Sequence, residues 1–210
     1  MSRDEASADQ RRRILRATAE LVAKRGFQGT TSELIVRRAR VGYATFYKHF
    51  ADKEECLLAL FEEVSGRIEA RLWEVYEQEP GAWPQKVAAV LRALFALIAA
   101  DPVVAKACLV ETLSAGPAAV AAYEAALKSL APMLRPGREL NPRGDKLPAT
   151  LEDTIAGGVL WVAYQRLIVG EAGELEQCLP ETIEFVLTPY LGEEEAVRVA
   201  AGELSSAGPA

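Results

Sequence analysis

The stretch from Thr30 to Lys53, TTSELIVRRARVGYATFYKHFADK, most constrains the fold, because it holds two short helical patterns only a few residues apart. Thr31 is a favourable N-cap for the first pattern, which we expect to form a helix over residues 31–38. The second pattern predicts a helix over residues 42–49. Two short helices joined by a tight turn form a helix-turn-helix, whose second helix enters the major groove of DNA.

Helical spacing of apolar residues recurs along the rest of the chain, and strand signals are scarce. We therefore predict an all-α fold, with a Pro- and Gly-rich charged loop at residues 135–149. Asp52 and Glu55 have the spacing of a capping box, in which each side chain accepts a backbone N–H at the start of a long helix. The expected helices cover residues 8–25, 31–38, 42–49, 53–77, 84–100, 102–114, 117–134, 151–169, 180–191 and 193–203.

The charge of the chain is unevenly distributed. Residues 1–53 contain 12 Lys or Arg and 6 Asp or Glu, whereas residues 54–210 contain 12 and 24. A basic N-terminal segment on an acidic body suggests that only this segment meets a polyanion, although chance clustering is an alternative. Four arginines near the start of the first expected helix oppose its dipole, so we expect a phosphate partner rather than fold stability to explain them, with solvated surface charge as the alternative. These are Arg11, Arg12, Arg13 and Arg16.

Several classes of protein do not fit the sequence. The longest apolar run, residues 93–100, is far shorter than the ~20 residues of a membrane span. The N-terminus lacks the apolar segment of a secretory signal, and the 3 cysteines have neither disulfide nor zinc spacing. His49 is the only histidine, and no nucleophile motif or phosphate loop is present. We expect a cytoplasmic protein that is not an enzyme, has no cofactor or metal, and has no membrane partner.

The N-terminal residues resemble the TetR family of bacterial one-component transcriptional regulators. The resemblance covers about residues 10–58 with unbroken spacing. It implies an N-terminal three-helix helix-turn-helix DNA-binding domain at residues 1–53. A six- to seven-helix effector-binding and dimerisation domain follows at residues 54–210. The matching positions are Arg13, Leu15, Ala17, Gly26, Phe27, Thr30, Thr31, Ile35, Ala39, Val41, Thr45, Phe46, Tyr47, His49, Phe50, Asp52, Lys53 and Glu54.

The resemblance also implies which residues contact DNA. The start of the second motif helix faces base edges, and this helix holds no Arg, Asn or Gln for a bidentate base contact. We therefore expect modest direct readout, with further specificity from DNA shape. The base-edge candidates are Gly42, Tyr43, Ala44 and Thr45, with Arg37 or Arg40 beside them. The phosphate candidates are Thr31, Tyr47, Lys48, His49 and Lys53, each of which has the alternative of a core or solvated surface position.

Two positions depart from the family pattern. The family commonly has Gly at the second position of the turn, where this chain has Arg40. If that position is left-handed, Arg costs ~1 kcal/mol relative to Gly. The family often has Ser at the start of the second motif helix, where Gly42 provides a weaker cap.

The resemblance implies that the C-terminal body, residues 54–210, is a sensor domain. We expect a repressor that binds a palindromic operator as a homodimer and leaves it when a small lipophilic or aromatic effector binds. The alternatives are a regulator controlled by a protein, and a helical binding protein with a vestigial DNA-binding head. Candidate effector-pocket residues are Phe61, Phe95, Glu111, Tyr123, Trp161, Tyr164 and Gln165. Candidate dimer-interface residues are Leu151, Ile155, Gly158, Val159, Val162, Ile183, Leu187 and Tyr190. The alternative is that the helix at residues 151–169 is the central helix of a monomer core.

Overall fold

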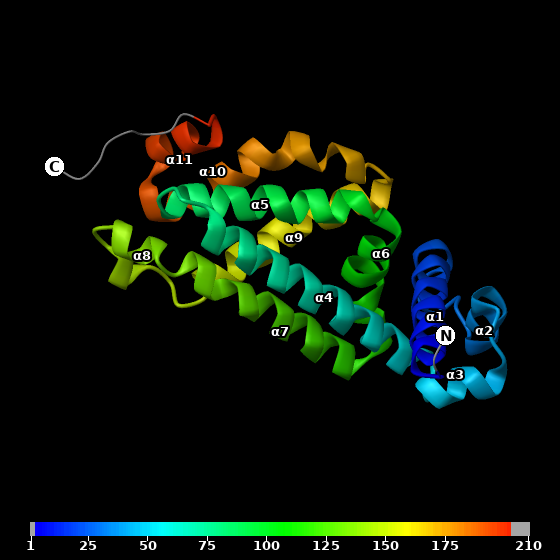
Figure 1. Ribbon diagram of the computed structural model, residues 1–210. Helices are drawn as coiled ribbons and strands as arrows, with labels where there is room; N and C mark the ends of the chain where they lie inside the picture. Colours follow the sequence, from blue (N-terminus) through cyan, green and yellow to red (C-terminus); the bar gives the residue numbers. More distant parts are fainter. Residues whose placement is uncertain (1–2, 203–210) are drawn as a thin grey trace. The chain divides into compact units, whose positions relative to one another are not determined.

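The computed structural model describes residues 3–202, and no strand occurs within this range (Figure 1). The predicted all-α class is confirmed. The α-helices are α1 (Arg3–Arg25), α2 (Ser32–Ala39), α3 (Tyr43–His49), α4 (Lys53–Gln78), α5 (Trp83–Ala100), α6 (Pro102–Lys106), α7 (Pro117–Leu134), α8 (Gly137–Leu140), α9 (Leu151–Val169), α10 (Leu179–Leu191) and α11 (Glu193–Ala200). A π-helical turn, η1 (Ala107–Glu111), and three 3₁₀ turns, η2 (Thr112–Ala115), η3 (Gly144–Lys146) and η4 (Ala172–Cys178), complete the order.

The helix boundaries agree with the sequence prediction except in three places. α1 begins at Arg3 rather than at residue 8, and the sixth predicted helix becomes π-helical and then 3₁₀ after Lys106. The predicted loop at residues 135–149 contains the short helices α8 and η3. The predicted end of the last helix at Glu203 lies outside the described residues.

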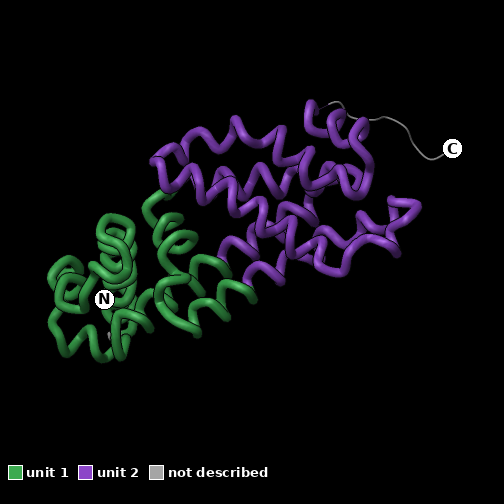
Figure 2. Tube along the Cα trace, turned by 180° about the vertical axis from the view of Figure 1, so that it is seen from behind, with its two compact units in different colours: residues 1–66, 101–125 green, residues 67–100, 126–210 purple. Residues whose placement is uncertain are grey.

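The chain forms two compact units (Figure 2). Unit 1 consists of residues 1–66 and 101–125, and unit 2 of residues 67–100 and 126–210. α4 and α7 each contribute to both units. The functional boundary between residues 53 and 54 does not separate these units and stays a prediction.

The arginines of α1 have partners within unit 1, which corrects the expectation that only phosphate would explain them. Because α1 begins at Arg3, these arginines lie beyond its first turn and do not oppose the helix dipole there. Their carboxylate partners are Glu63 for Arg11, Asp9 for Arg12 and Arg13, and Glu20 and Asp101 for Arg16. A phosphate partner is therefore not needed to account for them.

The turn between α2 and α3 is a Schellman motif. The N–H of Val41 donates to the carbonyl of Val36 at 3.2 Å, and that of Arg40 donates to Arg37 at 3.3 Å. Arg40 closes the motif in the left-handed conformation, with φ 55° and ψ 47°. It is the only non-glycine residue with positive φ among residues 3–202. The guanidinium of Arg13 donates to the Arg40 carbonyl at 3.4 Å, so α1 supports the turn directly.

Asp52 and Glu55 cap α4 reciprocally, as predicted. The Asp52 carboxylate accepts from the N–H of Glu55 at 2.7 Å, and the Glu55 carboxylate accepts from the N–H of Ala51 at 2.5 Å. Two backbone donors at the start of the helix are therefore satisfied, and the chain enters α4 at a fixed angle from α3.

Two carboxylates attach the segment after α5 to α1, within unit 1. Asp101 caps α6 by accepting from the N–H of Val104 at 3.2 Å, and its other oxygen pairs with Arg16. At the far end of the segment, Glu111 accepts a hydrogen bond of 2.9 Å from the N–H of Phe27, just beyond α1. Both ends of α6 and η1 are thus held against the first helix of the DNA-binding motif.

Unit 2 is built around α5, α9 and α10, whose inward faces are almost wholly apolar. α5 is long and apolar enough to cross a membrane, but half of it is buried within the unit, as in a core helix. Glu152 is buried on α9, where it accepts hydrogen bonds from Arg138 at 2.7 and 2.9 Å and from the Tyr190 hydroxyl at 3.1 Å. Burial raises the pKa of the Glu152 carboxyl, but these bonds outweigh burial and hold the pKa below its usual value.

We predict that Arg40→Gly raises the free energy of unfolding by about 0.5–1 kcal/mol, because Gly adopts positive φ without a clash between Cβ and the backbone. Urea denaturation monitored by circular dichroism measures the change. The matched control is Arg37→Gly, at an exposed position inside α2, which should lower the free energy by about 1 kcal/mol. Equal effects of the two substitutions would contradict the strain assigned to Arg40.

Candidate functional site

Helix α3 presents one face to solvent and one to the core of unit 1. Phe46 is fully buried, whereas the side chains of Tyr43 and Tyr47 are 51% and 56% exposed. The rings of Phe46 and Tyr47 meet edge to face at 5.3 Å, so the buried ring orients the exposed one. Two large aromatic side chains exposed on one short helix favour a ligand surface at α3.

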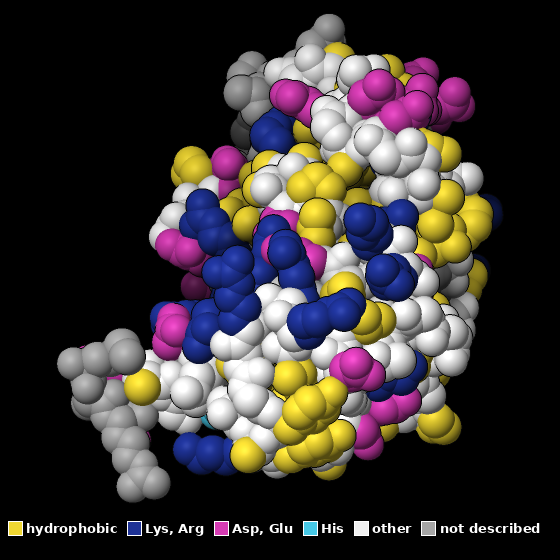
Figure 3. All heavy atoms as spheres, turned by 90° about the vertical axis from the view of Figure 1, so that its right-hand side faces the viewer, with side chains coloured by type: hydrophobic (Ala, Val, Ile, Leu, Met, Phe, Trp, Pro, Cys, Tyr) yellow, Lys and Arg dark blue, Asp and Glu magenta, His cyan; other side chains and the backbone are white. Residues whose placement is uncertain are grey.

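The predicted base-edge residues lie together at the start of α3. Gly42 is the N-cap and makes no side-chain hydrogen bond, as its sequence predicts. Ala44 is exposed and Thr45 is half-buried. A helix N-terminus carries a partial positive charge, so this end of α3 suits a polyanion. Figure 3, turned by 90° from the view of Figure 1, shows Lys and Arg side chains gathered beside exposed apolar ones.

The predicted phosphate residues differ in their availability. Lys48 and Tyr47 are exposed and carry no competing hydrogen bond that would restrict them. The hydroxyl of Thr31 accepts from the N–H of Leu34 at 3.3 Å as the cap of α2, which leaves its proton available to a phosphate. These three residues can therefore contact a phosphate backbone without breaking a contact of the fold.

Lys53 and His49 are more deeply involved in the fold. The ammonium of Lys53 donates to the carbonyls of Phe27 and Thr30 at 3.1 and 3.0 Å, and lies 4.3 Å from the centre of the Phe27 ring. Burial, with the charges of Lys48 and Arg11, lowers the pKa of His49. Its Nε2 atom is buried without a hydrogen-bond partner. His49 therefore presents a neutral ring, and Lys53 joins the start of α4 to the loop before α2.

Unit 2 contains an apolar cavity of about 60 Å³. Every side chain that lines it is hydrophobic, and the lining comes from α4, α5, α7, α9 and α10. Such an interior selects a ligand without charge or hydrogen-bonding groups in the buried part. Representative lining residues are Leu72, Val87, Leu94, Met133, Ala156 and Val186.

None of the predicted effector residues lines this cavity. Phe61 and Tyr123 stack on each other at 5.8 Å within unit 1, and Glu111 accepts the Phe27 N–H in the same unit. Trp161 and Tyr164 stack at 5.1 Å on α9, where Trp161 is 56% exposed. The remaining two predicted residues, both in unit 2, are Phe95, which is buried, and Gln165, which lines a surface groove.

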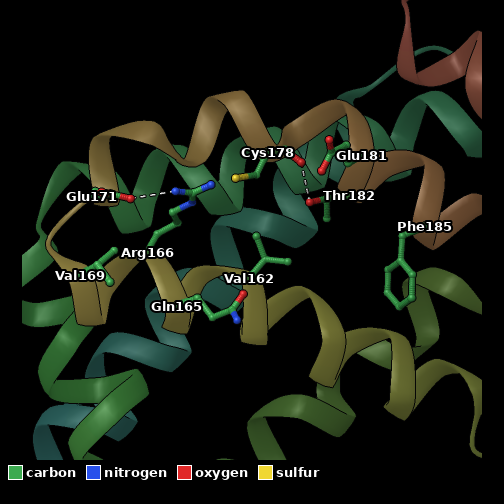
Figure 4. Close-up of a pocket in the computed structure, with 9 residues that line it drawn as sticks. All are labelled: Val162, Gln165, Arg166, Val169, Glu171, Cys178, Glu181, Thr182 and Phe185. Atoms are coloured by element: carbon green, nitrogen blue, oxygen red, sulfur yellow. Dashed lines mark hydrogen bonds and ion pairs between the residues drawn. The ribbon is translucent and has the colours of Figure 1, made fainter.

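The surface groove lies between α9, η4 and α10 and has a volume of about 580 Å³ (Figure 4). It mixes apolar and polar side chains, with Phe185 at one end and the ion pair of Arg166 and Glu171, at 2.8 Å, at the other. The groove residues are Val162, Gln165, Arg166, Val169, Glu171, Cys178, Glu181, Thr182 and Phe185.

Most of the predicted dimer residues point away from this surface. Five of them are buried in the core of unit 2, because α9 is apolar nearly all round and its periodicity does not distinguish the inner face from the outer one. These five are Ile155, Val159, Ile183, Leu187 and Tyr190. Gly158 is half-buried, and an added Cβ there would lie 2.9 Å from the Phe185 ring. Leu151 and Val162 are also half-buried, and the large exposed apolar side chains on α9 and α10 are Trp161, Ile168, Val169 and Phe185.

Residues 14–60 match the model of a family described as bacterial regulatory proteins, tetR family. Residues 14–60 thus resemble the N-terminal DNA-binding domain of that family. The matched region includes the end of α1, both helices of the motif and the start of α4. The family's DNA-binding motif is therefore complete in this chain, including the Schellman turn that Arg40 closes in place of glycine.

Two known proteins of one organism resemble part of the chain. The fatty acid metabolism regulator protein of Bacillus subtilis (strain 168) is 32% identical over 88 residues, which cover 42% of this chain and 45% of that protein. An uncharacterized regulator of the same organism, YerO, is 30% identical over 79 residues and matches over 27% of its length. The matches thus span less than half of either curated relative.

Solved structures share the fold over most of the chain. The fatty acid degradation regulator FadR of Bacillus halodurans has a TM-score of 0.75 and 21% identity, and the alignment covers 85% of this chain and 94% of that one. FadR of Bacillus subtilis, solved in complex with stearoyl-CoA, has a TM-score of 0.71 and 20% identity, covering 84% and 97%. At these identities the likeness shows a shared fold alone.

The sequence prediction missed the residues that line the cavity of unit 2. Their signal was present as apolar residues at helical spacing, such as Val87, Leu91 and Leu94 on α5. This spacing identifies the inner face of a helix but not the part of that face left without a packing partner. Among residues 3–202, no group of three or more His, Cys, Asp or Glu side chains is placed to hold a metal ion.

We predict that Lys48→Ala weakens binding to all duplex sequences alike and reduces the slope of log affinity against log salt by about one. The reason is that one fewer phosphate is neutralised and one fewer counterion is released. Fluorescence anisotropy of labelled duplexes over a range of salt concentrations measures both quantities. Lys146→Ala, at an exposed lysine of η3 in unit 2, is the matched control. An unchanged slope for Lys48→Ala would remove Lys48 from the phosphate contacts.

Proposed function

We propose that the chain is a cytoplasmic homodimeric repressor that binds a palindromic operator through α2 and α3. It leaves the operator when a long acyl chain, presented as an acyl-CoA thioester, enters the cavity of unit 2. The observation that carries the proposal is the wholly hydrophobic lining of that cavity. A methylene chain contributes about 0.8 kcal/mol per buried CH₂ and requires no polar partner, so it fits this lining better than an aromatic effector with polar groups does.

The relatives support the same class of effector. A curated relative is named as a regulator of fatty acid metabolism, and a structure of similar fold was solved with stearoyl-CoA. The lining of the cavity is consistent with the acyl part of such a molecule. The charged CoA part must remain outside the cavity, because unpaired charge in an apolar interior is strongly unfavourable.

The small volume of the cavity explains how the ligand regulates the protein. About 60 Å³ is far below the ~300–1,000 Å³ of pockets that hold drug-sized ligands, so an acyl chain enters only when the lining helices separate. The ligand therefore binds an expanded state and stabilises it at the expense of the compact one. α4 contributes to the cavity through Leu72 and, at its other end, follows the DNA-binding helices directly, so we assign it the transmission of the change.

The homodimer is assigned to the outer face of α9 and α10. This face exposes Trp161 and Phe185 beside the groove of about 580 Å³, and exposed apolar side chains around a groove are typical of an interface. A two-fold axis brings the same face of each copy together, so each copy provides both a groove and projecting aromatic side chains. Two copies are also needed to read two half-sites about 34–36 Å apart.

We predict that stearoyl-CoA releases the protein from an operator selected out of a random duplex pool, whereas CoA without an acyl chain does not. Val90→Glu places a carboxylate at the cavity wall, so at least about tenfold more stearoyl-CoA should be required for release. Leu97→Glu, at an exposed position two turns further along the same helix and outside the cavity lining, is the matched control and should respond like the wild type. Fluorescence anisotropy of the labelled operator measures release.

Two outcomes of this experiment would contradict the proposal. If stearoyl-CoA leaves the complex intact, an acyl-CoA is not the effector. If Val90→Glu and Leu97→Glu respond alike, release does not pass through the cavity. DNA binding that is lost in both variants before any ligand is added would show that α5 controls the DNA-binding helices without a small molecule.

We predict that Phe185→Glu raises the dissociation constant of the homodimer more than about tenfold, because two symmetry-related carboxylates would be buried at the interface. Analytical ultracentrifugation measures the dissociation constant, and operator affinity should fall in parallel. Val197→Glu, at an exposed apolar position of α11, is the control and should leave the dimer intact. A dimeric Phe185→Glu variant would move the interface away from α9 and α10.

A further inference from the structure

We propose that Trp83 and Tyr190 form the closed end of the cavity and set the longest acyl chain that the protein accepts. This inference rests on the proposed function, since it concerns the same cavity and the same class of ligand. It assigns a specificity role to residues that do not line the cavity themselves.

The two aromatic residues form a wall across one end of unit 2. Their rings meet at 5.2 Å in an edge-to-face arrangement, and the indole N–H of Trp83 donates to the carbonyl of Met133 at 2.8 Å. Gly137 lies against the indole, where an added Cβ would overlap the ring. α5, α7, α8 and α10 are thus joined at one point by packing and a hydrogen bond.

This wall lies one helical turn beyond the cavity on three helices. Trp83 precedes the lining residue Val87 by four positions on α5, and Tyr190 follows the lining residue Val186 by four positions on α10. Glu152 precedes the lining residue Ala156 by four positions on α9. Residues four apart lie on the same face of a helix, about 6 Å apart along its axis, so all three side chains follow directly on the lining.

The polar groups behind the wall make it resistant to opening. The hydroxyl of Tyr190 donates to Glu152, whose carboxylate is held by two hydrogen bonds from Arg138. Arg138 also donates to the carbonyls of Leu147 and Pro148 at 3.0 and 2.6 Å. A chain that pushed past Tyr190 would separate a buried carboxylate from its partners, which is far more costly than parting apolar side chains.

The opposite end of the cavity has no such wall among its lining residues. The lining continues away from Trp83 for two turns of α5, from Val87 to Leu94, and along α7 from Met133 back to Leu127. These side chains are aliphatic and have no hydrogen bonds to lose when the helices separate. The end at Trp83 is therefore where the methyl terminus of the chain stops.

The test is the affinity of the full-length protein for saturated acyl-CoA thioesters from octanoyl to stearoyl, measured by isothermal titration calorimetry. We expect affinity to rise about fourfold for each methylene that is buried, and then to stop rising once the chain reaches Trp83. Trp83→Leu should move this break to longer chains. Ala156→Leu adds bulk to the same end, so it should move the break to shorter chains, and it tests the wall even if Trp83→Leu fails to fold.

Trp73→Leu is the matched control, since Trp73 is a half-buried aromatic of α4 that lies outside the cavity lining. It should keep the wild-type break. A break that stays at the same chain length in Trp83→Leu and Ala156→Leu would overturn the proposed wall while leaving the acyl-CoA effector intact. If the wild-type protein binds no thioester of the series, the proposed function itself fails.

Discussion

The attachment of Asp101 and Glu111 to α1 is the contact on which unit 1 depends. Asp101 caps α6 with one oxygen and pairs with Arg16 through the other, while Glu111 accepts the N–H of Phe27. Because of these bonds, a segment that follows α5 in the sequence belongs to the same compact unit as the DNA-binding helices. A displacement of α6 breaks these two charge-assisted contacts unless α1 moves with it. Moving α1 together with α6 as one body keeps both contacts, so it costs less free energy.

The helical frame was predictable because its signals are local. Thr31, Asp52 and Asp101 each accept a backbone N–H three residues or fewer from the helix start, and the sequence alone places such caps. The family pattern left open whether Arg40 is left-handed, and its φ of 55° with the Schellman hydrogen bonds now answers that question. The π-helical turn after Lys106 was not foreseen, since its hydrogen bonds reflect packing against α1 rather than any residue preference.

The roles of individual side chains were less predictable because their partners are distant in the sequence. Arg11 pairs with Glu63, and Lys53 donates to the loop before α2, so charges that suggested phosphate contacts also hold the fold together. On α9, hydrophobic residues cover nearly every direction, and only packing decides that Val159 faces the core while Trp161 faces solvent. The spacing of hydrophobic residues identifies the buried face of a helix when the opposite face is polar. α9 is apolar on nearly all sides and has no such contrast.

Packing also bears on the proposed role of so small a cavity as a sensor. An apolar interior normally packs without voids, so a space of about 60 Å³ shows that α4, α5, α7, α9 and α10 do not close completely on one another. Under the proposed function, the side chains around this space lack some dispersion contacts, so less free energy is needed to separate the helices. A ligand that fills the space supplies the missing contacts. Under the same proposal, the charged pair of Arg138 and Glu152 resists this loosening one helical turn beyond the lining of α9 and α10, so the expansion has a direction. The proposed response of unit 2 to a ligand of limited length therefore rests on a void and on a rigid polar cluster next to it.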